Sequence, residues 1–169
     1  MVSVLLFEQH TRWQRSDIMA KSTYRTLRGS ITGSGNLKRT LLLDDGLINQ
    51  GYRITGFFVW CGDLLDANCK ATLSSKSKVA GSAQDAAVNT EIAWSTACQE
   101  MVAATGRNTV TRDDIVDEDH IVNRDLFISI TSGSEDVTWN YLIVMEARSL
   151  SDDEAILAII REEAQNVGA

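Results

Sequence analysis

The sequence predicts a mainly β protein: an antiparallel β-sandwich that ends in one α-helix, with a single jelly roll as one form that the sandwich can take. The first observation is that eight segments have strand character and are bounded by turn residues. The second is that a helical period replaces the strand period cleanly only after Ser151. Because 169 residues can fill one core, we expect residues 22–169 to form a single domain.

The N-terminal residues 1–21 are predicted to form an arm or a short helix that precedes this domain. Residues 2–7 are apolar and suit a short strand or a docking arm, whereas residues 11–21 have only a weak helical pattern. Strand-like alternation then covers residues 23–43 and is interrupted by a Gly-rich turn at 33–36. Two strands joined by such a turn predict a β-hairpin.

Residues 51–61 give the next strong strand pattern. Phe57 and Val59 fall on one face, and the other face holds four larger residues: Tyr52, Ile54, Phe58 and Trp60. Since both faces are apolar, we expect this strand to be central in its sheet.

The next part of the chain is less regular. Residues 70–74 predict a short strand and residues 75–84 a polar loop. Residues 89–104 fit both a strand and a helix, and we favour a strand as far as Cys98. Residues 105–123 are predicted to be a long, polar and acidic connection.

The clearest pattern lies between residues 125 and 147. Two runs of alternating residues are joined by a five-residue polar loop, which predicts an antiparallel hairpin. The second run is apolar on both faces, so we expect it to be a central, doubly covered strand. We expect the following side chains to be buried in mutual contact: Trp139, Tyr141, Ile143, Phe58, Ile54, Leu126 and Ile128.

The C-terminal helix is predicted over residues 151–167. Ser151 and Glu154 form a capping box, and acidic residues follow in the first turn. Replacing Ser151 with alanine should cost ~1 kcal/mol of stability. The helix is expected to pack on the β body through an apolar stripe: Ile156, Ile160, Ala164 and Val167, widened by Leu157 and Ile159.

The net charge of −7 is unevenly distributed. Through Arg53 the chain has eight basic and four acidic residues, and the remainder has eight basic and nineteen acidic residues. This asymmetry indicates a basic face for nucleic acid, attraction between copies, or simply two solvated faces. Six basic residues are candidates for weak, non-specific contact with nucleic acid or an acidic partner: Arg12, Arg15, Arg25, Arg28, Lys38 and Arg39.

Other features argue for a chain made in a reducing compartment. Its three cysteines lack C-x-x-C spacing, so we expect free thiols. The apolar N-terminal run has no basic region before it and is too short for a signal peptide. No run approaches the ~18 apolar residues of a membrane span.

No motif predicts a catalytic centre, a cofactor or a metal site. The Gly-rich stretch 29–35 lies between strands, so a hairpin turn is favoured over a phosphate-binding loop. The acidic stretch 113–119 favours a solvated loop over a weak Ca²⁺ site. Cys98 and His120 are candidates for a nucleophile and its general base, but no local motif supports this pair. Trp60, Trp94, Trp139 and Phe58 suit a core better than a stacking site.

Two segments resemble coat proteins of small environmental viruses: DEDHIVNRDLFI at 117–128 and NYLIVMEARSLSDDEAILAIIREEAQ at 140–165. The segment EIAWSTA at 91–97 is similar in the same way. The resemblance implies a virion structural protein whose partners are copies of itself and other virion proteins. Coat proteins that condense nucleic acid often have a strongly basic arm, whereas residues 1–10 contain no lysine or arginine. A shell role and a decoration role therefore both remain.

The resulting hypothesis is a self-assembling capsid, shell or decoration subunit, made in the host cytoplasm and located in the virion. Four apolar residues are the expected subunit contacts: Val2, Val4, Leu5 and Phe7. One alternative is a ligand- or carbohydrate-binding β-sandwich module. The other is a small hydrolase built on Cys98 or His120.

Overall fold

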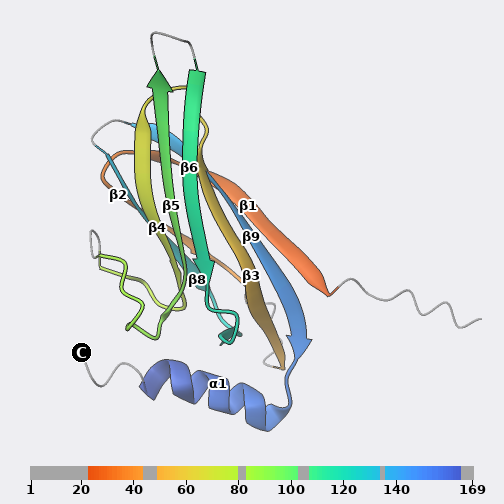
Figure 1. Cartoon of the computed structure of the whole chain (residues 1–169). Coiled ribbons are helices and arrows are strands. Elements are labelled where there is room, and N and C mark those ends of the chain that lie inside the picture. Colours follow the sequence, from red (N-terminus) through yellow and green to blue (C-terminus); the bar gives the residue numbers. More distant parts are fainter. Residues whose placement is uncertain (1–22, 44–48, 80–82, 103–106, 134–135, 165–169) are drawn as a thin grey trace, which may run out of the picture.

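In the computed structural model, residues 23–43, 49–79, 83–102, 107–133 and 136–164 are described. They form two antiparallel sheets that pack face to face, as the sequence predicts (Figure 1). The strands are β1 Tyr24–Gly33, β2 Asn36–Leu41, β3 Gln50–Cys61, β4 Ala67–Ser74, β5 Glu91–Val102, β6 Arg107–Val116, β7 Ile121–Val122, β8 Leu126–Ser132 and β9 Val137–Ser149. One helix follows, α1 Asp152–Ala164.

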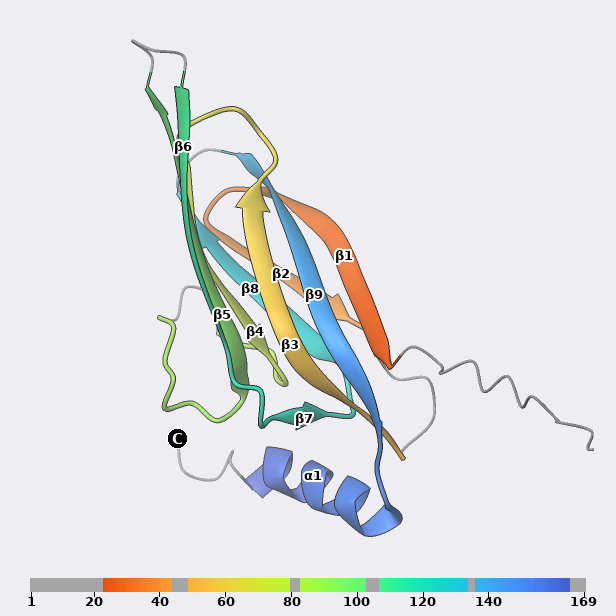
Figure 2. The same ribbon diagram turned by 45° about the vertical axis from the view of Figure 1, so that its right-hand side comes forward.

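The two sheets have strand orders β1-β9-β3-β7 and β2-β8-β4-β5-β6. The pairing is nested, because early strands pair with late ones: β1 with β9, β2 with β8, β3 with β7 and β4 with β5. The chain therefore crosses repeatedly from one sheet to the other. In Figure 2 the two sheets appear as separate layers, and α1 lies across their lower end beside β7.

Both predicted hairpins are wrong. β1 and β2 belong to different sheets, as do β8 and β9. Gly33 and Gly35 have φ angles of 151° and 69°, so the chain can turn the corner between the sheets there. Alternation identifies a strand and its buried face, but it does not distinguish a turn within one sheet from a crossing to the facing sheet.

β3 contains an irregularity that the sequence pattern did not reveal. Its register with β9 shifts between Ile54 and Gly56, which indicates a β-bulge. One extra residue exchanges the two faces of the strand, so Phe57 and Val59 are fully buried after it. Phe58 is therefore only half-buried and Trp60 is exposed, contrary to the expectation for Phe58.

The core lies between the inner faces of the two sheets. The other six predicted core residues are buried in a single cluster: Trp139, Tyr141, Ile143, Ile54, Leu126 and Ile128. β9 is central, as predicted, but its second face is only partly covered, because Leu142 and Val144 are half-buried.

Two further segments differ from their predictions or extend them. The expected connection at 105–123 contains β6, a ten-residue strand that pairs with β5 along its length. Its polar and acidic residues gave no strand pattern, because much of an edge strand is exposed to solvent. The predicted strands at 70–74 and 89–98 are confirmed, and both are longer in the structure.

Helix α1 is confirmed together with its cap. The backbone N of Glu154 donates to Ser151 Oγ at 3.3 Å, and the backbone N of Ser151 donates to Glu154 Oε2 at 2.9 Å. The bond from the Ser151 backbone N, together with one from Ser151 Oγ to the same carboxylate oxygen at 2.9 Å, holds the pKa of Glu154 below its usual value. The predicted packing stripe is wrong, because Ala155 is buried whereas Ile156 and Ile160 are exposed. Val167 and the N-terminal residues 1–21 lie outside the described residues.

Candidate functional site

Four of the candidate basic residues lie along one side of the sandwich. β1 is an edge of the four-stranded sheet, β2 is an edge of the five-stranded sheet, and the two strands contact each other. We call this side the basic edge and define it by its four residues: Arg25, Arg28, Lys38 and Arg39. The structure thus brings together residues that the sequence analysis selected by charge alone.

Three of these residues have partners inside the chain. Arg25 Nη1 donates to Tyr52 Oη at 2.6 Å, with its guanidinium 5.4 Å from the ring centroid. Arg39 Nη1 donates to the Ser30 carbonyl at 2.6 Å and so joins β2 to β1. Lys38 Nζ donates to the Lys78 carbonyl. Only Arg28 is both exposed and without a hydrogen bond or ion pair to any described residue.

The remaining contact residues cannot be placed in the same way. Arg12, Arg15 and the four apolar residues Val2, Val4, Leu5 and Phe7 lie outside the described part of the chain. Their predicted contacts therefore stay predictions.

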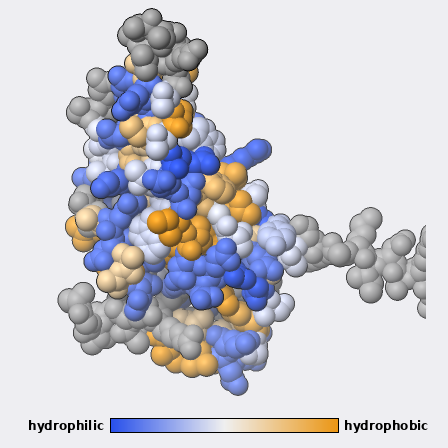
Figure 3. Space-filling view, viewed as in Figure 1, coloured by the Kyte–Doolittle hydropathy of each residue, from blue (hydrophilic) through white to orange (hydrophobic). Residues whose placement is uncertain are grey.

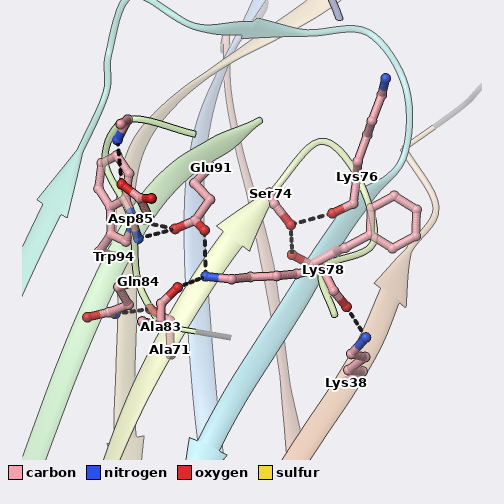
Figure 4. Close-up of polar contacts among 12 residues, drawn as sticks. Lys38, Ala71, Ser74, Lys76, Lys78, Ala83, Gln84, Asp85, Glu91 and Trp94 are labelled. Carbon is pink, nitrogen blue, oxygen red and sulfur yellow. Dashed lines mark hydrogen bonds and ion pairs between the residues drawn. The ribbon is translucent and has the colours of Figure 1, made fainter. Parts of the chain in front are cut away.

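A buried carboxylate anchors the long β4–β5 connection to the five-stranded sheet (Figure 4). Glu91 is 2% exposed and its Oε1 is 2.5 Å from Lys78 Nζ. Its Oε2 accepts hydrogen bonds from Trp94 Nε1 at 2.7 Å and from the backbone N of Asp85 at 3.1 Å. Lys78 Nζ also donates to the Ala83 carbonyl. Both oxygens of this carboxylate therefore have a hydrogen-bond or ion-pair partner.

This network fastens the connection over the outer surface of the sheet. Gln84 Nε2 adds a hydrogen bond of 2.9 Å to the Ala71 carbonyl in β4. Thr72 and Ser74, which are polar strand residues, are buried as a result. Sequence reasoning identified the loop but missed Lys78 and Glu91, because a lysine and a glutamate thirteen residues apart give no periodic signal.

A pocket of about 510 Å³ lies where β4 begins and β5 ends, next to the end of β8. Its polar lining includes Asp66, Asn68 and Glu100, with Met101 and Val137 as apolar members. Gln99 supports the wall, since its Nε2 donates to the Asp63 carbonyl at 2.7 Å. Two carboxylates and an amide suit a cationic or hydroxyl-rich ligand. Sequence analysis did not select any of these residues.

The acidic stretch 113–119 is divided among separate partners rather than gathered. Asp114 accepts a hydrogen bond from Ser95 Oγ at 2.6 Å and pairs with Arg112 at 2.7 Å. Glu118 pairs with Arg53 at 2.8 Å. Among the described residues, no three acidic, histidine or cysteine side chains are grouped so that they could hold a metal ion.

Cys98 and His120 are far apart. Cys98 pairs with Thr111 in the β5–β6 ladder, whereas His120 follows Val116, which pairs with Ala93. The five steps along the strand from Ala93 to Cys98 span ~16 Å, so the two side chains are not within hydrogen-bond reach. Burial lowers the pKa of His120, and the nearby Asp117 opposes this shift.

The two packed antiparallel sheets define this chain as a β-sandwich protein. Comparisons with models of protein families, with curated proteins and with solved structures found no match. No helix in the described ranges is long and apolar enough to cross a membrane.

Proposed function

We propose that this chain is a jelly-roll structural subunit of a virion, which assembles with copies of itself and with other virion proteins. The order of strand pairing is the observation that supports the proposal most. β1–β5 and β7–β9 supply eight strands in two four-stranded sheets with nested pairs, and β6 extends one sheet at its edge. Jelly rolls are frequent in viral capsid proteins, although lectins and cupins use them too.

Exposed apolar side chains on the surface are candidates for contacts between subunits. The β5–β6 hairpin extends beyond the other strands at the upper end of the molecule in Figure 1. Met101 and Val110 on this hairpin are 44% and 58% exposed, and Ile115 lower on β6 is 63% exposed. Such side chains can become part of an interface where a neighbouring copy covers them. The segments that resemble coat proteins contain β7, most of β9 and α1.

Size-exclusion chromatography with light scattering, followed by negative-stain microscopy of the peak, tests the proposal. We expect shells, rings or large oligomers at high protein concentration. Deleting residues 1–7 should abolish these assemblies, while circular dichroism still reports a folded β protein. A monomer at every concentration, for the full-length chain, would contradict the proposed function.

The pocket beside Asp66 favours a second candidate, a ligand- or carbohydrate-binding module. Isothermal titration with a panel of simple sugars and polyamines would detect such an activity. Under this alternative, Asp66→Asn and Glu100→Gln should each weaken binding. The matched change Asp113→Asn, on β6 outside the pocket lining, should leave binding unchanged.

A further inference from the structure

Helix α1 presents three large apolar side chains to solvent. Ile156, Leu157 and Ile160 are 54%, 52% and 53% exposed, whereas Ala155 is buried. At about 100° per residue, the three exposed positions fall within one ~100° arc roughly opposite Ala155. We call these three residues the apolar face of α1.

Acidic residues border this face. Asp152, Asp153 and Glu154 occupy the exposed first turn, and the helix sequence holds five acidic residues against one arginine. Figure 3 shows apolar and hydrophilic side chains side by side at the lower end of the molecule, where α1 lies. A complementary partner would therefore combine apolar side chains with positive charge.

The segment that precedes the sandwich has such a composition. Residues 1–22 hold the apolar residues Val2, Val4, Leu5 and Phe7, followed by Arg12 and Arg15. They lead into Thr23, whose carbonyl accepts a hydrogen bond from the backbone N of Ala147, five residues before α1 begins. At ~3.3 Å per residue, 22 residues can span ~70 Å, several times the ~20 Å length of α1. The segment is therefore long enough to extend well beyond its own α1.

We propose that residues 1–7 of one copy bind the apolar face of α1 on a neighbouring copy, with Arg12 and Arg15 near the acidic residues of that helix. This inference rests on the proposed function, because it names the surfaces through which subunits join. Burial of the apolar residues supplies most of the affinity, and the charges mainly orient the two surfaces. The contact is heterologous, so repeated copies can close into a ring or shell.

Photo-crosslinking of the full-length chain tests this inference. p-Benzoylphenylalanine replaces Phe7, and equal amounts of ¹⁴N- and ¹⁵N-labelled chains are mixed before assembly. After irradiation, mass spectrometry identifies the crosslinked peptides and their isotopes. We expect crosslinks from position 7 to the peptide containing residues 152–164, including pairs of mixed isotope.

Variants of the helix provide the specificity test. Ile156→Ser with Ile160→Ser should lower the mixed-isotope crosslink yield about tenfold or more, because the receiving surface loses most of its apolar area. Leu64→Ser is the matched control, since Leu64 is 82% exposed in the β3–β4 connection and should leave the yield unchanged. Circular dichroism checks that each variant keeps its fold.

Three outcomes would overturn the inference. The first is crosslinks only within one isotope, which indicate docking on the same chain. The others are crosslinks to other surfaces instead of α1, and an unchanged crosslink yield in the double variant. If assemblies form with any of these results, only this inference fails. If the chain stays monomeric and gives no mixed-isotope crosslink, the proposed function fails with it.

Discussion

Glu91 illustrates how single residues hold a long connection against the sheet. Its carboxylate is buried, and Lys78 is its only cationic partner among the described residues. Lys78→Met should therefore destabilise the fold by ~3–5 kcal/mol, because it leaves a buried charge uncompensated. Lys78→Met combined with Glu91→Gln should cost less than Lys78→Met alone. Urea denaturation followed by Trp fluorescence measures both effects.

The exposed pair Arg148–Glu146 is the matched control for this prediction. Its nitrogen–oxygen distance is 3.1 Å and both side chains are accessible, 44% and 24%. Arg148→Met should change the stability by ~1 kcal/mol or less, as is usual for surface ion pairs. Equal losses in Lys78→Met and Arg148→Met would show that the buried pair does not anchor the connection.

The three cysteines should differ in reactivity. Burial raises the pKa of Cys69 to about 12, with a hydrogen bond to the Ala97 backbone opposing this shift. Because the thiolate is the reactive form, Cys69 should resist iodoacetamide at pH 8 in the folded protein. Cys61 and Cys98 are only half-buried and should react first. Mass spectrometry after short labelling times, in native buffer and in urea, distinguishes these cases; equal rates in native buffer would contradict the burial of Cys69.

At the scale of single elements, the bulge in β3 gives a direct test of register. Phe57 is fully buried, whereas Phe58 lies over Gly56 on the other face, with the Arg112 guanidinium 5.1 Å from its ring centroid. Phe57→Ala should cost ~3–5 kcal/mol, and Phe58→Ala clearly less, because its ring is already half-solvated. Regular alternation without the bulge predicts the reverse order, so the two urea midpoints decide between the registers.

The same strand shows what the sequence could predict. Apolar alternation located most of the strands and six of seven expected core residues, since side-chain burial repeats every two residues in a strand. It failed after Ile54, because one inserted residue exchanges the faces without changing the composition. It also failed for β6, whose position at a sheet edge tolerates residues such as Arg112 and Asp113.

Contacts between residues distant in the sequence were harder to predict than helices and strands. The capping box of Ser151 and Glu154 located α1 correctly, since capping depends on neighbouring residues only. The face on which α1 packs depends on distant strands, so the sequence did not show that Ala155 would be buried while Ile156 and Ile160 stay exposed. For the same reason the pocket at Asp66 and the Lys78–Glu91 pair had no signal in the sequence. Clustered positive charge selected the four residues of the basic edge, and their predicted contacts with a partner stay a prediction.

At the scale of the whole molecule, the charge asymmetry of the sequence becomes an asymmetry of the sandwich. β2 and β6 are opposite edges of the five-stranded sheet, which is ~19 Å wide at the usual strand spacing. The basic edge lies on the β2 side. β6 holds two arginines and two aspartates, and Asp117, Glu118 and Asp119 follow it, so this side is net acidic. An arrangement with opposite charges on opposite edges favours contact between unlike edges of two copies.

This arrangement predicts how the proposed assembly should depend on salt. At 0.1 M ionic strength, charges are screened beyond ~10 Å. Added salt should therefore slow the approach of two copies more than it weakens the packed contacts between them. Stopped-flow light scattering should therefore show association rates that fall steeply with added NaCl. Finished assemblies, followed by analytical ultracentrifugation, should dissociate much less over the same range of salt.

A pair of charge reversals tests whether the basic edge itself is responsible. Arg28 is exposed and has no partner among the described residues, so Arg28→Glu should slow association severalfold at low salt without destabilising the fold. Lys70→Glu changes the net charge equally, but Lys70 lies on β4 in the middle of its sheet. Because electrostatic steering depends on where the charge lies, this control should slow association less, and the two rates should converge at high salt. Equal slowing in both variants would show that net charge, rather than the basic edge, governs the encounter between copies.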